Sequence, residues 1–91
     1  MFARTIRVEY EAEAGAKPRP APLAWLDSFA MRNFTNDPAF DDTLPTGDGE
    51  LQIGARVPLE KLAAAMEDWF RRKGYLKKEA RLLLEERPRQ K

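Results

Sequence analysis

The chain has 91 residues, of which 43% are hydrophobic and 34% charged, and its formal net charge is +1. This is the composition of one small folded domain. It contains neither cysteine nor histidine, which excludes disulfides, thiolate metal sites and imidazole-based catalysis. We therefore expect no enzyme activity, metal or cofactor. Because no apolar run resembles a signal peptide or a membrane span, we also expect a cytoplasmic protein without membrane contact.

The charges are unevenly distributed. Residues 1–26 carry four basic and three acidic groups, residues 27–50 one and six, and residues 51–91 eleven and six. The near-neutral total thus conceals an acidic middle and a basic end. Such blocks are typical of solvated faces that keep a protein soluble, and they also mark candidate electrostatic binding surfaces.

Residues 2–11 alternate between apolar and charged side chains. Ile6, Val8 and Tyr10 point one way, and the residues between them point the other. This period of two predicts a strand that is buried on one face. Residues 12–22 follow with three prolines and one glycine, which predicts a stiff loop without ladder hydrogen bonds.

Pro22 is expected to open a helix of about three turns. Leu23, Leu26, Ala30 and Phe34 recur at helical spacing, with Trp25 and Phe29 beside them. These residues predict an apolar face packed on the core.

Residues 35–50 contain two prolines, two glycines and five acidic groups, and this composition predicts a long irregular loop. Loops of this length are often functional, so we interpret this one as a surface that binds a protein partner. Its acidic groups lack the spacing of an EF-hand, which argues against calcium. An alternative for Phe40 is that it packs back onto the core. The candidate partner-binding residues are Asp37, Phe40, Asp41, Asp42, Leu44 and Asp48.

A second strand is predicted at residues 50–57, where Leu51, Ile53, Ala55 and Val57 alternate with other residues. Asp48 and Gly49 form the expected turn into it, and Gly54 suggests a bulge or a close backbone approach. The pattern leaves open whether this strand runs parallel or antiparallel to the first.

The strongest helical signal lies at residues 58–73. Apolar residues fall on one face, with Pro58 expected at the first helical position and Gly74 just beyond the end. Trp69 and Phe70 are the expected anchors of the core, because large aromatic side chains bury most area.

A shorter final helix is predicted at residues 75–87, followed by a disordered basic tail at residues 88–91. The helix-Gly-helix order of the last two elements suggests a helix-turn-helix, against which the turn is too short and the last helix lacks base-reading residues. Its basic junction is a candidate contact for nucleic acid phosphates. Its basic residues are Arg71, Arg72, Lys73, Lys77, Lys78 and Arg81.

These elements predict a single α+β domain over residues 1–87 in the order β-α-loop-β-α-α. Two strands need support, so we expect helices against one face of the sheet or an extension of the sheet across a homodimer. By elimination the sequence favours a small non-enzymatic protein-interaction module, such as an adaptor, inhibitor or regulatory subunit, for which a phage or mobile element is one natural source. The alternative function is nucleic acid binding at the basic junction.

Overall fold

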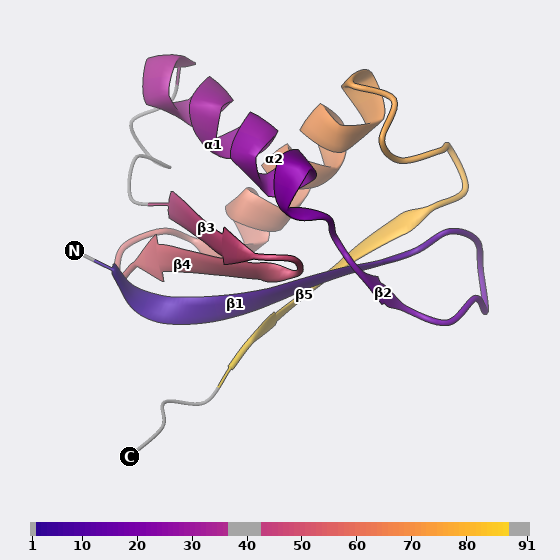
Figure 1. Ribbon diagram of the computed structural model, residues 1–91, viewed down its shortest axis with the longest axis horizontal. Helices are drawn as coiled ribbons and strands as arrows, with labels where there is room; N and C mark the ends of the chain where they lie inside the picture. The colour runs from indigo at the N-terminus through magenta and orange to yellow at the C-terminus, as the bar shows by residue number, and fades with distance from the viewer. Residues whose placement is uncertain (1, 37–42, 88–91) are drawn as a thin grey trace.

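The computed structural model describes residues 2–36 and 43–87. These residues form a small compact α+β fold with one five-stranded antiparallel sheet and two helices on the same face of that sheet (Figure 1). The elements are β1 (Phe2–Glu11), β2 (Arg19–Pro20), α1 (Leu23–Asn36), β3 (Thr43–Gly47), β4 (Glu50–Gly54), α2 (Leu59–Arg72) and β5 (Arg81–Glu86). The predicted fold class is confirmed, but the two-stranded sheet and the element order are wrong.

The long strand β1 is the centre of the sheet, because both of its edges are paired. Ile6 lies opposite Leu51 of β4 on one side and Glu86 of β5 on the other. Strand β2 lies on the same edge of β1 as β4, further along β1. At the boundary between them, the N–H of Val8 donates to the carbonyl of Gly49, and the carbonyl of Val8 accepts from the N–H of Ala21. The sheet therefore reads β3-β4-β1-β5 across its width, with β2 added beside the second half of β1. Every pairing is antiparallel, which settles the strand direction that the sequence left open.

Apart from β2, the connectivity is β-α-β-β-α-β, the split βαβ arrangement known as ferredoxin-like. Each helix links two strands that are separated by another strand of the sheet. This topology supports many unrelated activities, so any function has to be argued from particular side chains.

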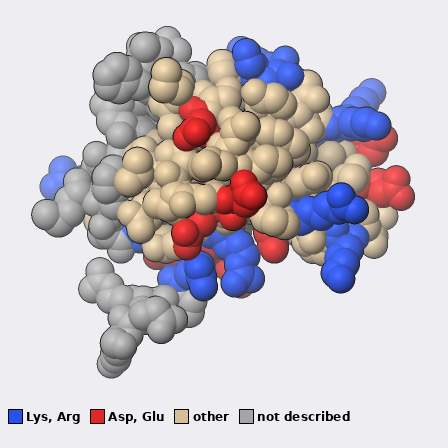
Figure 2. Space-filling model, viewed as in Figure 1, with Lys and Arg blue, Asp and Glu red and all other residues tan. Residues whose placement is uncertain are grey.

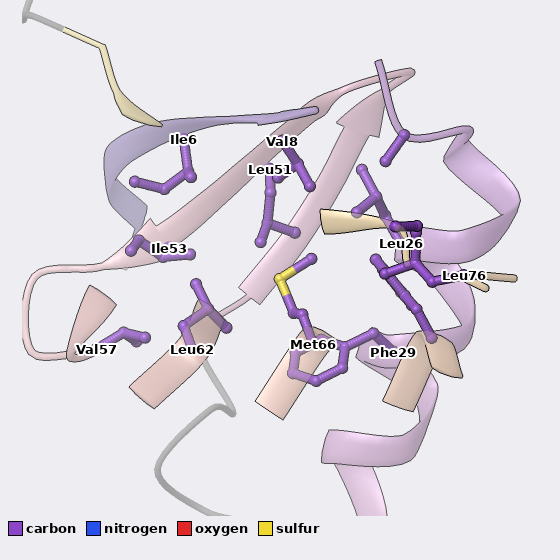
Figure 3. Close-up of a cluster of buried hydrophobic side chains, with 13 residues drawn as sticks. Ile6, Val8, Leu26, Phe29, Leu51, Ile53, Val57, Leu62, Met66 and Leu76 are labelled. Atoms are coloured by element: carbon purple, nitrogen blue, oxygen red, sulfur yellow. The ribbon is translucent and has the colours of Figure 1, made fainter. Parts of the chain in front are cut away.

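The core lies between the sheet and the helices. Figure 3 shows side chains from β1 and β4 directed toward side chains from the helices. The largest fully buried residues are Ile6, Val8, Leu26, Phe29, Leu51, Ile53, Leu62, Met66 and Phe70. Burial of one such side chain stabilises the fold by roughly 1.5–3 kcal/mol, so this cluster is the main source of stability.

Helix α2 confirms the predicted amphipathic face, with Phe70 fully buried and Gly74 at a φ of 84° beyond the helix end. Two details differ. Pro58 has φ −76° and ψ 120°, so it is the residue before the helix and not its first turn. Trp69 is only half-buried, and its indole Nε1 donates a 2.9 Å hydrogen bond to Ser28 Oγ of α1. Phe70 alone is therefore the central anchor, and Trp69 ties the two helices together.

Helix α1 begins at Leu23, directly after Pro22, and Leu26 and Phe29 are buried on its inner face. Leu23 itself is 37% exposed, unlike the prediction, because it occupies the first turn, at the border of the core. The side chain of Phe34 lies outside the described residues. The helix continues through Asn36, so the start of the predicted loop is helical.

The long irregular loop predicted at residues 35–50 is wrong, because residues 43–47 form strand β3. Pro45 concealed the strand, since proline cannot donate to a ladder. The pairing register directs the backbone groups of Leu44 toward β4 and those of Pro45 toward the free edge. An edge strand therefore tolerates this proline, which also discourages another strand from pairing there. Residues 37–42 lie outside the described part of the chain.

Strand β4 is shorter than predicted and ends at Gly54, after which the chain turns and leaves Ala55 exposed. The register between the two strands shifts near Gly54, but the extra residue lies on the partner strand, between Phe2 and Arg4. Val57 is still buried, since the chain folds back onto the core before α2.

The final helix predicted at residues 75–87 is also wrong, because residues 81–86 form strand β5 and no helix-turn-helix exists. Three successive leucines fit a helix and a strand equally well. The open edge of β1 decides between them, since it offers ladder hydrogen bonds along six paired positions from Ile6 to Glu11. Long-range pairing thus overrides the local pattern.

Candidate functional site: an aromatic pocket at the end of β1

A pocket of about 240 Å³ opens where the end of β1, the start of α1 and the connection between α2 and β5 meet. Its volume suits one side chain better than a drug-sized molecule, which typically needs about 300 Å³ or more. The lining residues are Tyr10, Ala12, Glu13, Trp25, Tyr75, Leu76, Lys77, Glu79 and Ala80.

Three half-buried aromatic rings form one wall of the pocket. Trp25 and Tyr75 are stacked with centroids 5.3 Å apart and planes 5° apart. Tyr10 lies 4.9 Å from Trp25 with its plane tilted by 43°. Buried Phe70 supports both Trp25 and Tyr75 from the core side, at 5.5 and 6.0 Å. This packing holds the rings in a fixed arrangement before any ligand is present.

Local structure explains how the three rings converge. The alternation of β1 turns Tyr10 toward the helices, and Trp25 lies in the first turn of α1. The positive φ of Gly74 reverses the chain after α2, and the N–H of Tyr75 then bonds to the carbonyl of Phe70 at 2.8 Å. This is the geometry of a Schellman-type helix end, and it places Tyr75 beside the helix that it follows.

Each of the three rings carries a polar group with room for a partner. The indole N–H of Trp25 and the hydroxyls of Tyr10 and Tyr75 make no hydrogen bond to any residue that the structure describes. Buried aromatic groups of these types normally find such a partner. The exposed parts of these half-buried rings can therefore contact an apolar or cationic group, and the donors and acceptors can fix its orientation.

Charged side chains complete the pocket. Glu13 and Glu79 supply two negative charges and Lys77 supplies one positive charge, so the lining has a net charge of −1. All three are exposed. Aromatic faces and carboxylates both attract cations, which makes the pocket more favourable to a positive group than to a phosphate.

Of the residues predicted to bind a protein partner, the structure describes two, Leu44 and Asp48. Asp37, Phe40, Asp41 and Asp42 lie outside the described residues. Leu44 is 43% exposed on β3. Asp48 Oδ1 accepts a 2.8 Å hydrogen bond from the N–H of Leu23, so its carboxylate is already used to cap α1.

Most residues of the basic junction already have partners or are dispersed. Arg71 bonds to Glu67 and to the carbonyl of Ala80, Arg72 pairs with Asp68, and Lys73 lies 5.3 Å from the centroid of the Trp69 ring. Arg81 lies opposite Glu11 on the sheet face away from the helices. Lys77 and Lys78 are exposed without such contacts. Figure 2 shows that basic and acidic side chains are mixed on the face it presents.

The outward face of the sheet offers a second, more polar pocket of about 280 Å³, lined by residues that include Arg7, Glu9 and Arg87. Two of its charges pair with each other, since Arg87 lies 3.2 Å from Glu50, and Arg7 lies 3.8 Å from Glu85 of β5. No aromatic side chain lies in this lining, so it has no platform for stacking a base. We therefore regard the aromatic pocket as the stronger candidate site.

Neither a metal centre nor a membrane span appears in the described ranges. Residues 2–36 and 43–87 contain no group of three acidic side chains arranged to hold a metal ion. Neither helix that the structure describes is long and apolar enough to cross a membrane.

The sequence did not identify the pocket as a site. Tyr10 and Trp25 were assigned to apolar faces and Tyr75 to a final helix, because no spacing relates residues that meet only through the fold. In comparisons with known proteins, no family model, curated protein or solved structure matches this chain.

Proposed function

We propose that this protein is a small non-enzymatic protein-interaction module that captures a basic side chain of a partner in the aromatic pocket. The observation that supports this proposal best is the wall of Tyr10, Trp25 and Tyr75, bordered by Glu13 and Glu79. Tyrosine and tryptophan are the residues that most often dominate protein interfaces, because they bury large areas at low entropic cost.

The chemistry of the wall favours arginine or lysine as the captured residue. A guanidinium or ammonium group gains about 0.5–2 kcal/mol over an aromatic face, and a nearby carboxylate adds to this attraction. Lys77 opposes such a cation, but it lies on an exposed connection and its long side chain can swing away. The methylene stem of the captured residue would fill the rest of a pocket of about 240 Å³.

Nucleic acid binding, the alternative function, has weaker support. Arg71 and Arg72 each have an acidic partner one helical turn away, which reduces their attraction for phosphate. Lys77, Lys78 and Arg81 have no ion pair among the described residues, but Arg81 lies on the sheet face away from the helices, which leaves the two lysines on the connection for phosphate contacts. Two phosphate contacts give only weak, salt-sensitive binding.

The proposal can be tested by nuclear magnetic resonance with the peptide Ac-Gly-Arg-Gly-NH₂. The chain has two tryptophans, and their indole N–H signals report on two places. The signal of Trp25 should shift on titration, while that of Trp69 should stay, because its N–H already bonds to Ser28. An isolated side chain should bind with a Kd on the order of 1 mM.

Variants separate the role of each charge. Glu13→Gln and Glu79→Gln should weaken binding of the arginine peptide, whereas Lys77→Gln should strengthen it, because the repelling ammonium is removed. Glu60→Gln, at an exposed position on α2 outside the lining, is the matched control and should change nothing.

Two results would overturn the proposal. One is an equal response to Ac-Gly-norleucine-Gly-NH₂, which has no charge and would show that only apolar contact matters. The other is a Trp25 shift with a single-stranded oligonucleotide at low salt and none with the arginine peptide, which would assign the pocket to nucleic acid.

A further inference from the structure

In the described part of the chain, strand β5 pairs with β1 at one edge and has no partner strand at the other. The N–H of Arg87 bonds to Thr5 of β1, so the backbone groups of the odd-numbered residues face β1. Those of Leu82, Leu84 and Glu86 therefore face the other way. An unpaired strand edge is a template for pairing with another chain.

The first part of this edge is shielded and the rest is open. Glu67 Oε2 accepts a long 3.3 Å hydrogen bond from the N–H of Leu82, and Arg71 donates to the carbonyl of Ala80. The backbone groups of Leu84 have no partner among the described residues. Since β3 carries Pro45 at its free edge, β5 is the outer strand better able to accept a neighbour.

The outward face of this segment has a self-complementary charge pattern. Arg81, Leu83 and Glu85 alternate along this face, with charges +, 0 and −. An antiparallel copy centred on Leu83 places Arg81 of each copy opposite Glu85 of the other. Both charges that β5 carries on this face then meet an opposite charge, and the half-buried Leu83 meets its own copy.

The same register suits the backbone and the other face. It sets Leu82 opposite Leu84 of the second copy, and these are the residues whose backbone groups face the free edge. On the helix side of the sheet, this register brings the half-buried side chains of Leu82 and Leu84 from the two copies together. A register whose paired residue numbers sum to two more would instead oppose Arg81 to Arg87, and one whose numbers sum to four more would oppose Glu85 to itself. Like charges in cross-strand pairs are unfavourable.

We propose that the protein forms a homodimer by antiparallel pairing of β5 with β5 about Leu83, which joins two sheets into one. The symmetry is that of an isologous two-fold interface. The N–H of Leu84 bonds to the carbonyl of Leu82 in each direction, and Glu67 releases the N–H of Leu82 to complete the ladder. This surface is separate from the aromatic pocket, so either proposal can fail alone.

Cysteine cross-linking tests the register. The chain has no cysteine, so Leu83→Cys introduces one thiol, and the paired positions across the two-fold axis are close enough for a disulfide. Mild oxidation should convert the protein largely to a covalent dimer. Leu44→Cys, on the exposed edge strand β3, is the matched control and should stay monomeric. Equal cross-linking of both variants, or of neither, would refute the proposal.

Charge exchange provides an independent test by sedimentation equilibrium. Arg81→Glu alone and Glu85→Arg alone each create two like-charge pairs in their homodimers, so each should dimerise about tenfold more weakly than the unmodified protein. An equimolar mixture restores opposite charges in the heterodimer and should recover the original affinity. An unmodified protein that stays monomeric throughout, or a mixture no tighter than its components, would overturn the proposal.

Discussion

A methyl group added at Gly49 should lower the stability of the fold more than one added at Gly15, Gly47 or Gly74. It joins three segments: its N–H bonds to Ala21 at 2.7 Å and its carbonyl accepts from Val8 at 2.9 Å. Its φ is 70°. A Cβ placed there would lie 2.6 Å from Cβ of Pro20 and 3.2 Å from the carbonyl oxygen of Val8. Gly49→Ala therefore combines two separate costs.

The other glycines let the two costs be separated. Gly15 and Gly74 have φ of 83° and 84°, and an added Cβ at either would touch nothing within 4 Å. Alanine there should cost about 1 kcal/mol, which is the left-handed backbone term alone. Gly49→Ala should cost about 2–4 kcal/mol, because overpacking adds about 1–3 kcal/mol. Gly47→Ala meets no contact and has no positive φ, so it should be close to neutral.

Urea unfolding followed by circular dichroism gives the four free energies directly. With about 4–8 °C of Tm for each kcal/mol in a chain of this size, the difference between Gly49→Ala and Gly15→Ala is also large enough to see on heating. If Gly49→Ala loses no more stability than Gly15→Ala and Gly74→Ala, the close packing of β2 against the β3–β4 turn is not as described.

Three further substitutions test the interior. Phe70→Ala should cost about 3–5 kcal/mol because it leaves a cavity at the centre of the core; a loss below about 1 kcal/mol in urea unfolding would contradict the placement. Trp69→Phe should cost about 1 kcal/mol through the lost bond to Ser28, and a Ser28→Ala background should reduce that loss. Asp48→Ala should cost about 1 kcal/mol by uncapping Leu23, which hydrogen exchange confined to the first turn of α1 would reveal.

Elements whose apolar residues repeat at a single spacing over many positions could be predicted from the sequence. The alternation of β1 and the helical face of α2 each extend over many residues, and both were predicted in nearly their observed places. Strands β3 and β5 were missed for opposite reasons. Proline argues against a strand in a sequence, yet Pro45 is tolerated because its position faces the free edge of the sheet and needs no N–H donor. The leucine run of β5 has neither a helical nor a strand period, and it becomes a strand only because it pairs with β1.

The candidate site was beyond sequence reasoning because its parts belong to different elements. Tyr10, Trp25 and Tyr75 lie on a strand, a helix and a connection, and they meet only because the fold brings the end of β1, the start of α1 and the connection after α2 together. The sequence predicted the acidic character of residues 35–50 but could not show that Asp48 is used within the fold. Chemical type was readable at each position, whereas proximity was not.

The central position of β1 has a consequence for synthesis of the chain. Arg4 forms an ion pair with Glu86, 82 residues later, so β1 is made long before its last partner. At a synthesis rate of roughly 5–20 residues per second, the edge of β1 that pairs with β5 stays without its partner for several seconds. Such distant pairing also makes folding slow. We expect the charges at Arg7, Glu9 and Glu11 to oppose the pairing of this unpaired strand with other nascent chains.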